Sequence, residues 1–235
     1  MYTVLDGRVR YSEADSSGAM SVKSVFDYLQ DCCIFQSEKA GQGVNTLKEE
    51  HRAWLVAVWH LKFIRLPRLF EDIKVMTWPY KFREYFGYRC HSIETTDGEK
   101  LISGNSIWMF VNTDTGRPNK ISQTQYDAYT LEDRLEMPFG SMHIKCRGDY
   151  TEGGSFKIHK YQLDTNGHTN NSQYVMMAAD CLPDDFTYSE VKVVYKHEAL
   201  LGDTVASRLY TGEDKIDVEL VSEDGKAFAV VEFTR

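Results

Sequence analysis

Two segments of the chain carry apolar residues at the spacing of an amphipathic helix. In the first, they lie three and four positions apart: Val22, Val25, Phe26, Leu29 and Cys32. Gly41 and Gly43 follow and predict where this helix ends. In the second, Asn170 or Asn171 offers an N-cap, and an apolar stripe follows it: Tyr174, Val175, Met177 and Ala178. The pattern predicts one helix in each half of the chain.

Each predicted helix is followed by strand-like segments. After the first helix these are 54–64, 72–82 and 85–111, the last interrupted by the hairpin signal Asp97-Gly98. After the second they are 191–196 and 203–209, then strands joined at Asp224-Gly225. This order predicts two α+β units in which an antiparallel sheet wraps a helix. Fusing the two units would cover the edge and the apolar flank that one unit leaves open.

The two halves also match residue by residue. With an offset of 149, the matched pairs are Asp15 with Asp164, Gly18 with Gly167, Asp31 with Asp180 and Cys32 with Cys181. With an offset of 131, segment 69–72 falls on 200–203, and the two hairpin turns lie 127 apart. The shrinking offsets indicate a shorter second copy. We therefore predict a first repeat at 1–120, a linker at 121–154 and a second repeat at 155–235.

The predicted linker is recognised by its breakers. Prolines and glycines gather in segment 117–154: Pro118, Pro138, Gly153 and Gly154. A short helix is expected from Ser122.

Composition excludes several classes of protein. The 235 residues are 42% hydrophobic, enough for a core and too many for a disordered chain. No apolar run is long enough to span a membrane, and residues 1–10 lack a signal core, so we expect a cytoplasmic protein. The net charge of −8 argues against a nucleic-acid partner. The five cysteines lack metal-site spacing, so reduced core thiols are expected, and neither a cofactor nor a metal is implied: Cys32, Cys33, Cys90, Cys146 and Cys181.

Segment 163–174 carries the most specific motif of the chain. It resembles the signature of acyl-acyl carrier protein thioesterases, which runs Asp-x-Asn-x-His-x-Asn-Asn-x-x-Tyr. Segment 195–199 is similar to the family's Tyr-Arg-Arg-Glu-Cys, and segments 106–109 and 117–121 also look like family segments. The resemblance implies an α+β double hot-dog fold, in which two fused hot-dog repeats each wrap an antiparallel sheet around a long helix.

The same motif groups acid–base side chains at a turn that leads into a helix. Asp164, Asn166 and His168 are spaced by two, which projects them to one side of an extended turn, and Glu198 would arrive from the next strand. A carboxylate can activate water or attack directly, and a histidine can carry the proton. The turn's N–H groups, at the helix N-terminus, are expected to polarise a carbonyl. We predict these four residues to be catalytic.

The first copy lacks these groups. Ser17 replaces Asn166, Ala19 replaces His168, and Glu198 faces Leu66 or Pro67, so only the aspartate survives, as Asp15. We therefore expect one active site, in the second repeat, with the first repeat contributing pocket wall and acyl-chain space. Ala199 stands where many family members carry a cysteine, which excludes a thiol nucleophile there.

The roles of the four residues follow from carboxylate chemistry. Asp164 would attack the thioester carbonyl or support that attack. Asn166 and His168 would orient and stabilise it, and Glu198 would position the hydrolytic water. A covalent intermediate and direct attack by water both remain open.

The resemblance implies a fatty acyl thioester of acyl carrier protein as substrate, hydrolysed to the free fatty acid and the holo-carrier protein. Other functions remain open: an acyl-CoA thioesterase with the same residues, a hot-dog dehydratase, or a non-catalytic acyl-thioester-binding protein. Residues of the first helix are predicted beside an acyl tunnel: Phe26, Leu29, Cys33 and Phe35. Monomer and homodimer are both compatible with the sequence.

Docking of the carrier raises an electrostatic problem. Acyl carrier proteins are acidic and so is this chain, so docking would need a local basic patch. The candidates are Lys62, Arg65, Arg68, Lys192 and Lys196.

Overall fold

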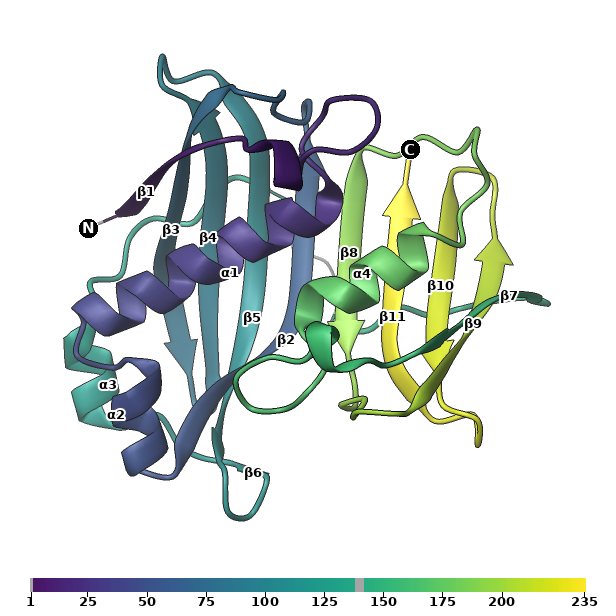
Figure 1. The fold of residues 1–235 in the computed structure, drawn as a ribbon. Helices are drawn as coiled ribbons and strands as arrows, with labels where there is room; N and C mark the ends of the chain where they lie inside the picture. Colours follow the sequence, from purple (N-terminus) through teal and green to yellow (C-terminus); the bar gives the residue numbers. More distant parts are fainter. Residues whose placement is uncertain (1, 138–141) are drawn as a thin grey trace. The chain divides into compact units, whose positions relative to one another are not determined.

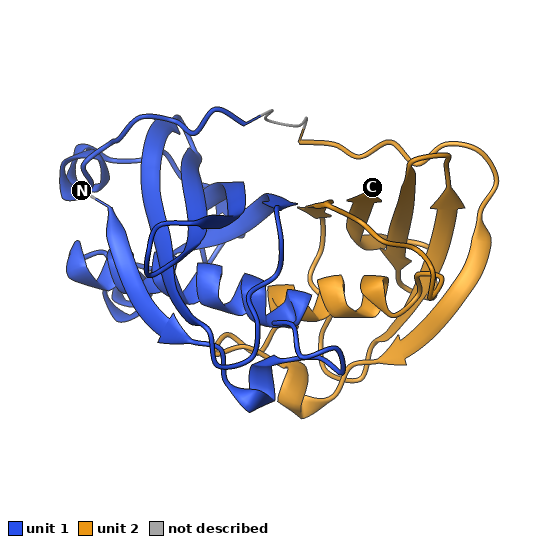
Figure 2. Cartoon of the chain, turned by 90° about the horizontal axis from the view of Figure 1, so that it is seen from above, with its two compact units in different colours: residues 1–139 blue, residues 140–235 orange. Residues whose placement is uncertain are grey.

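The computed structural model describes residues 2–137 and 142–235, so the predicted linker residue Pro138 lies outside the described residues. The chain divides into two compact units, unit 1 at 1–139 and unit 2 at 140–235, which Figure 2 shows in different colours. Each unit contains one main helix and an antiparallel sheet, as the sequence predicts. No helix among the described residues is long and apolar enough to cross a membrane.

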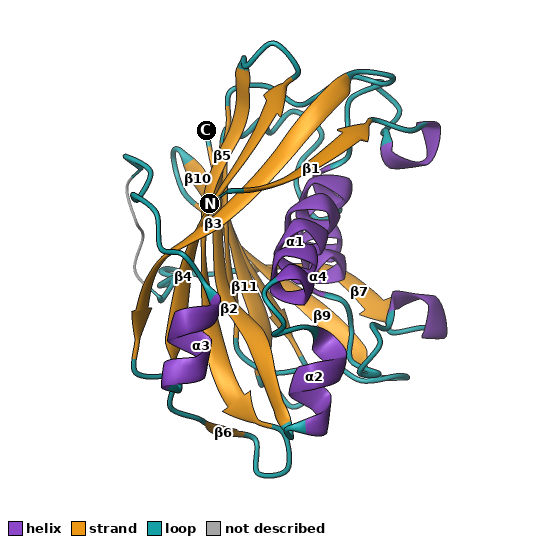
Figure 3. Cartoon of the chain, turned by 90° about the vertical axis from the view of Figure 1, so that its left-hand side faces the viewer, coloured by secondary structure: helices purple, strands orange, loops and turns teal. Residues whose placement is uncertain are grey.

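Unit 1 is built on a strongly twisted antiparallel sheet with strand order β1-β3-β4-β5-β2, and β6 pairs with β5. The long helix α1 lies across one face of this sheet (Figures 1 and 3). The elements of unit 1 are β1 (Thr3–Arg8), the 3-10 turn η1 (Tyr11–Glu13), α1 (Val22–Lys39), α2 (Val44–Glu49), β2 (Arg52–Phe63), β3 (Asp72–Arg83), β4 (Phe86–Thr95), β5 (Lys100–Asn112), β6 (Arg117–Pro118) and α3 (Gln123–Ala128).

The first predicted helix is confirmed as α1. The Ser21 side chain accepts the Ser24 N–H as an N-cap, and Gly41, with φ 69°, follows the C-terminus. The apolar stripe is buried, and Phe26 meets Trp59 of β2 edge to face at 5.8 Å. Each such side chain contributes about 1.5–3 kcal/mol to folding. Phe35, predicted beside an acyl tunnel, is instead 47% exposed, because its position on the helix falls outside this stripe.

Unit 2 repeats the plan with fewer residues. Its sheet has strand order β8-β11-β10-β9-β7, and α4 packs on β10 and β11. The elements of unit 2 are β7 (Thr151–Lys157), the 3-10 turn η2 (Lys160–Gln162), α4 (Asn171–Ala179), β8 (Glu190–Tyr195), β9 (Thr204–Thr211), β10 (Lys215–Val221) and β11 (Ala227–Thr234).

The residues of the predicted linker lie in different kinds of structure. Ser122 caps α3 by accepting the Gln125 N–H, which confirms the expected short helix. Gly153 and Gly154 lie inside β7, which begins at Thr151, and the pairing with β9 shifts register there. A Cβ on Gly153 would come within 2.4 Å of the Ser207 hydroxyl. Gly153 therefore allows a close approach of β9, and both glycines lie in a strand rather than in a linker.

The second offset of the repeat needs a correction from 131 to 132. In unit 1 the Glu71 N–H donates to Arg68 O and the Phe70 N–H to Val9 O; in unit 2 the Asp203 N–H donates to Leu200 O and the Gly202 N–H to Ile158 O. Asp203 therefore corresponds to Glu71, not to Asp72. Asp72 and Asp203 are the same residue type, and pairing them for that reason shifts the alignment of the two copies by one residue.

The cysteines behave as small, reduced side chains. All five carry free thiols; Cys32, Cys33 and Cys90 are buried, while Cys146 and Cys181 are partly exposed. Burial raises the pKa of Cys32 to about 12. A thiol of that pKa stays protonated at neutral pH and is a poor nucleophile.

Candidate active site

Asp164 organises a tight turn between η2 and α4. Its Oδ1 accepts the Asn166 N–H at 2.8 Å and the His168 N–H at 3.1 Å. The turn is closed by the Asp164 N–H, which donates to His168 O at 2.8 Å, and Gly167 adopts φ 80°. The Asp164 carboxylate thus fixes the backbone that carries the Asn166 and His168 side chains.

Three of the turn N–H groups that were expected to bind an oxyanion already have partners inside the turn. The N–H groups of Asn166 and His168 both donate to the Asp164 carboxylate, and the Gly167 N–H donates to Asp164 O. The prediction that turn amides polarise a carbonyl is therefore wrong for these three groups, because the aspartate that shapes the turn also consumes its donors.

His168 and Glu198 lie together, although 30 residues separate them in the sequence. His168 Nε2 is 3.6 Å from Glu198 Oε2, an ion-pair distance longer than a hydrogen bond. The two side chains are 35% and 53% exposed, so the pair is open to solvent. An imidazole and a carboxylate in this arrangement can share the proton of a water molecule or of a leaving thiol.

A cluster of hydrogen bonds around Ala199 holds this pair in place. Ala199 O accepts both the Thr169 N–H at 3.1 Å and the Thr169 hydroxyl at 2.7 Å. The Ala199 N–H donates to the Tyr174 hydroxyl at 2.8 Å. Because Thr169 follows His168 and Ala199 follows Glu198, these bonds tie together the two backbones that carry the candidate pair.

Sequence reasoning did not assign these positioning residues. Tyr174 was placed in the apolar stripe of the helix, and it is indeed buried, which raises the pKa of its phenol. Tyr174 occupies the last position of the motif in segment 163–174, and this position was the indication in the sequence of a role beyond packing. The predicted N-cap is confirmed, since Asn170 Oδ1 accepts the Ser172 N–H at 3.0 Å.

Asp203 closes the segment that carries Glu198. Its Oδ2 accepts the Leu200 N–H at 2.8 Å. In unit 1 the Glu71 carboxylate accepts the Arg68 N–H in the corresponding bond. A carboxylate at this position therefore shapes the turn in both units.

The turn of unit 1 has the same backbone without the same side chains. Asp15 Oδ1 accepts the N–H groups of Ser17 and Ala19 at 2.8 and 3.2 Å. The Met20 N–H donates to Pro67 O, as the Thr169 N–H donates to Ala199 O. Leu66 is therefore the counterpart of Glu198, which settles the choice between Leu66 and Pro67.

Two of the predicted basic docking residues are engaged or buried. The Arg65 guanidinium binds the carboxylates of Glu71 and Glu99 at 2.7 and 2.9 Å, and these bonds raise its pKa. Lys192 is 7% exposed, and burial lowers its pKa. The stretch around Arg65 contains no acid in sequence, but the fold brings two to it.

Among the described residues, no group of three or more His, Cys, Asp or Glu side chains is arranged to hold a metal ion.

Comparisons with known proteins agree with one another. Residues 6–129 match the model of the acyl-ACP thioesterase N-terminal domain, and residues 148–233 match that of the acyl-ACP thioesterase C-terminal domain. The oleoyl-acyl carrier protein thioesterase 1 of Arabidopsis thaliana chloroplasts is 24% identical over 85% of this chain and 61% of its own length. The chain thus spans about three fifths of the length of this relative.

Solved structures show the same fold. An acyl-ACP thioesterase from Bacteroides thetaiotaomicron matches 99% of this chain and 97% of its own, with a TM-score of 0.91 at 19% identity. The 12:0-ACP thioesterase from Umbellularia californica matches 99% of this chain and 96% of its own, with a TM-score of 0.83 at 18% identity. Together with the family models, which cover most of the sequence, these matches place the chain in the acyl-ACP thioesterase family, with its hot-dog fold.

Proposed function

We propose that this protein is a thioesterase that hydrolyses fatty acyl-acyl carrier protein to the free fatty acid and the holo-carrier protein. The observation that carries the proposal is the His168–Glu198 pair at 3.6 Å, on backbones tied together through Ala199. Membership of the family and the name of the Arabidopsis relative, an oleoyl-acyl carrier protein thioesterase, support the substrate class.

In this mechanism Glu198 and His168 activate one water molecule. The water gives up a proton to the pair as its oxygen attacks the thioester carbonyl, and a tetrahedral oxyanion forms. The exposed Asn166 side chain carries an amide donor that can stabilise this oxyanion, a role that the engaged turn amides cannot take. Collapse of the intermediate breaks the C–S bond. His168 returns the proton to the leaving sulfur, so the products are a carboxylic acid and a thiol.

Asp164 acts as a positioning residue in this proposal. Its Oδ1 holds the turn by accepting two N–H groups, and Asp15 does the same in the unit that lacks the histidine and the glutamate. This favours support of the attack over attack by Asp164 itself. The covalent alternative is testable in a single turnover in H₂¹⁸O: label in the Asp164 carboxylate would show an anhydride cleaved at the Asp164 carbonyl, and trapping of the acylated Asp164 would detect an anhydride cleaved at the fatty acyl carbonyl.

The test of the proposed function is release of free thiol from oleoyl-acyl carrier protein. The parent protein is expected to release it, and His168→Ala is expected to lower kcat/KM by about 10²- to 10⁴-fold. A parent protein that releases no thiol from either oleoyl- or dodecanoyl-acyl carrier protein, or a His168→Ala variant that keeps full activity, would contradict the proposal. Oleoyl-CoA at the same chain length separates a carrier-protein enzyme from an acyl-CoA thioesterase, which would use the same residues.

A cytoplasmic location and a monomeric or homodimeric state belong to the same proposal. The five free thiols support a reducing compartment. Sedimentation analysis of the purified protein would decide the oligomeric state.

A further inference from the structure

Two surface segments of unit 2 adjoin the His168–Glu198 pair. Segment 157–161 runs from the last residue of β7 into η2, and segment 196–201 follows β8 and contains Glu198. Backbone bonds connect the two segments: the Ile158 N–H donates to Asp203 O at 2.9 Å, and the Gly202 N–H donates to Ile158 O at 3.0 Å. We call the exposed side chains of these two segments, Glu198 excepted, the docking rim.

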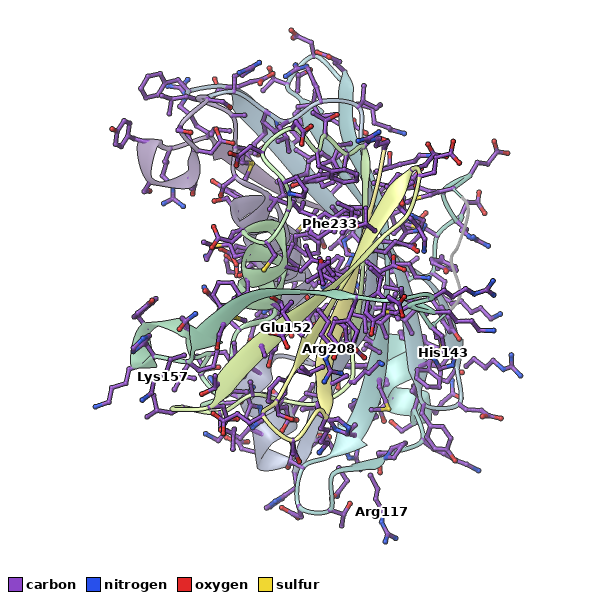
Figure 4. All side chains as sticks on the ribbon, turned by 90° about the vertical axis from the view of Figure 1, so that its right-hand side faces the viewer. Arg117, His143, Glu152, Lys157, Arg208 and Phe233 are labelled. Atoms are coloured by element: carbon purple, nitrogen blue, oxygen red, sulfur yellow. The ribbon has the colours of Figure 1, made fainter. Side chains whose placement is uncertain are left out.

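The docking rim presents cations that no carboxylate neutralises. Lys157, Lys160 and Lys196 are exposed, and in the described part of the chain none of them forms an ion pair. Figure 4 shows the Lys157 side chain reaching outward from the end of β7. The exposed imidazole of His159 stacks on Tyr161, with ring centroids 5.8 Å apart.

At two positions that correspond to rim residues, unit 1 also carries basic side chains, and there each is paired with an acid. At an offset of 149, Lys157 corresponds to Arg8 and His159 to Arg10. The Arg8 guanidinium binds the Asp72 carboxylate through two bonds of 2.6 and 2.7 Å, and Arg10 pairs with Glu13.

Both acids are absent from unit 2. Thr204 stands at the position of Asp72, and Gln162 stands at the position of Glu13. The copy with the candidate active site keeps basic residues and loses their partners. Turn geometry does not require this change, because the backbone bonds are the same in both units.

Large apolar side chains are exposed on the same rim. Tyr161 is 80% exposed, and Leu200 and Leu201 are 49% and 51% exposed. At these three positions unit 1 has Ser12, Arg68 and the half-buried Leu69, while its own exposed large side chains, Tyr11 at 82% and Phe70 at 66%, fall at the positions of Lys160 and Gly202. The apolar side chains are therefore placed differently in the two copies, and the loss of the acids is the clearer difference. Large apolar side chains exposed together on one surface are typical of a surface that binds a partner, and tyrosine is enriched at protein interfaces.

The acids near the rim are all engaged by their own unit. Asp164 holds its turn, Asp203 accepts the Leu200 N–H, and Glu198 faces His168. These contacts leave the negative charges in place, but they hold the carboxylates within unit 2, so among the described residues the lysines are the rim's charged side chains without an ion-pair partner of their own.

We propose that the docking rim of unit 2 is the surface on which the acyl carrier protein binds, an inference that rests on the proposed function. The occupant is an acidic protein whose thioester must reach Glu198, which lies within the rim's own segment. The whole chain has a net charge of −8, so it repels such a partner at long range. Local lysines then decide where the partner docks, and the leucines and the tyrosine add apolar contact.

The test is charge reversal at Lys157 and Lys160, which lie away from Glu198 in the sequence. We expect Lys157→Glu/Lys160→Glu to raise KM for oleoyl-acyl carrier protein about tenfold or more. The ratio of kcat/KM for the carrier substrate to that for S-oleoyl-pantetheine, which has no protein to dock, should fall by a similar factor. Lys100→Glu, an exposed charge reversal in unit 1, should leave this ratio as it is in the parent protein.

A binding measurement separates failure of docking from failure of the hydrolase. Oleoyl-acyl carrier protein is titrated calorimetrically into His168→Ala protein with and without the two lysine reversals. Binding weakened about tenfold by the reversals supports the docking rim, even if the parent protein releases no thiol. Equal binding by both proteins, or an equal loss of kcat/KM on both substrates, overturns it.

Discussion

In unit 1 the Asp15 carboxylate accepts the N–H groups of Ser17 and Ala19, and in unit 2 the Asp164 carboxylate accepts those of Asn166 and His168. The four distances fall between 2.8 and 3.2 Å. Each turn also contains a glycine in the left-handed region, Gly18 and Gly167. The two copies therefore share one backbone at this place.

The comparison separates architecture from chemistry. An aspartate present in both copies with the same bonds is accounted for by the turn that it builds. The residues that differ are those able to move a proton or polarise a carbonyl: Asn166, His168 and Glu198, against Ser17, Ala19 and Leu66. The docking rim also differs between the copies: unit 2 lacks counterparts of Asp72 and Glu13, although its backbone at this place is the same.

Among the variants that compare the two copies, Glu198→Gln is expected to give the largest loss of kcat. The amide keeps the size of the side chain but cannot take a proton, so kcat should fall by about 100-fold or more. Thiol release from oleoyl-acyl carrier protein measures it. Leu66→Gln, at the corresponding position of unit 1, is the matched control and should change kcat less than about twofold. Equal losses in the two variants would mean that the copies do not divide the chemistry.

Substitution of the two aspartates tests the positioning role directly. Asp15→Ala and Asp164→Ala should each lower the free energy of unfolding by about 1–2 kcal/mol, because each removes the same backbone acceptor. Only Asp164→Ala should also lower kcat, by about 10- to 100-fold, because His168 loses its fixed position. Urea unfolding and thiol release are measured on both variants.

Asp164→Asn distinguishes positioning from nucleophilic attack. The amide oxygen can still accept the two turn N–H groups, so we expect kcat to stay within about tenfold of the parent value. An amide cannot form the acyl anhydride that attack by Asp164 requires. Complete loss of turnover with an intact fold would therefore favour the covalent mechanism.

Local pattern predicted the main helix of each unit and the strands that follow it, but not β1, α2 or the start of β7, nor the longer-range bonds. The helix cap at Asn170 and the hairpin at Gly98 follow from residues adjacent in the chain, and each is where the sequence placed it. The His168–Glu198 contact was predictable because the family resemblance linked the two segments. Apart from that resemblance, spacing alone carried no information on contacts between distant segments.

The predictions that were wrong depended on such contacts. The N–H groups of Asn166 and His168 donate to the Asp164 carboxylate in the same turn. Arg65 binds Glu99, which lies 34 residues away in the sequence. Lys192 sits in β8 with buried neighbours on both sides. A residue's charge is visible in sequence, but its burial and its partners are set by strands that pair later in the chain.

Thr169→Val should give a smaller effect that is confined to turnover. It removes the 2.7 Å hydroxyl bond to Ala199 O and leaves the N–H bond at 3.1 Å. Glu198 then loses part of its support, and we expect kcat to fall about 5- to 10-fold with little change in KM. Tyr174→Phe removes the bond on the other side of Ala199 and should act in the same direction. A rise in KM at constant kcat would instead indicate a role in binding.

The smallest expected effect concerns a turn position where both copies adopt a positive φ but only the second copy has a glycine. Phe70 adopts φ 69° and is 66% exposed, and its counterpart Gly202 adopts φ 89°. A non-glycine residue in the left-handed region costs about 1–2 kcal/mol, which glycine avoids. Glycine also makes the unfolded chain more flexible, and this offsets about 0.4–1 kcal/mol of the gain. Phe70→Gly should therefore raise the free energy of unfolding by up to about 1 kcal/mol.

Gly202→Ala is the reciprocal change. A Cβ at Gly202 meets no atom within 4 Å, so any cost comes from the backbone alone, and we expect a loss of about 1 kcal/mol. Urea unfolding of both variants gives the two signs. If Phe70→Gly destabilised the protein instead, the exposed ring would be making contacts that outweigh its strain, and the first copy would have a use for this turn that the second lacks.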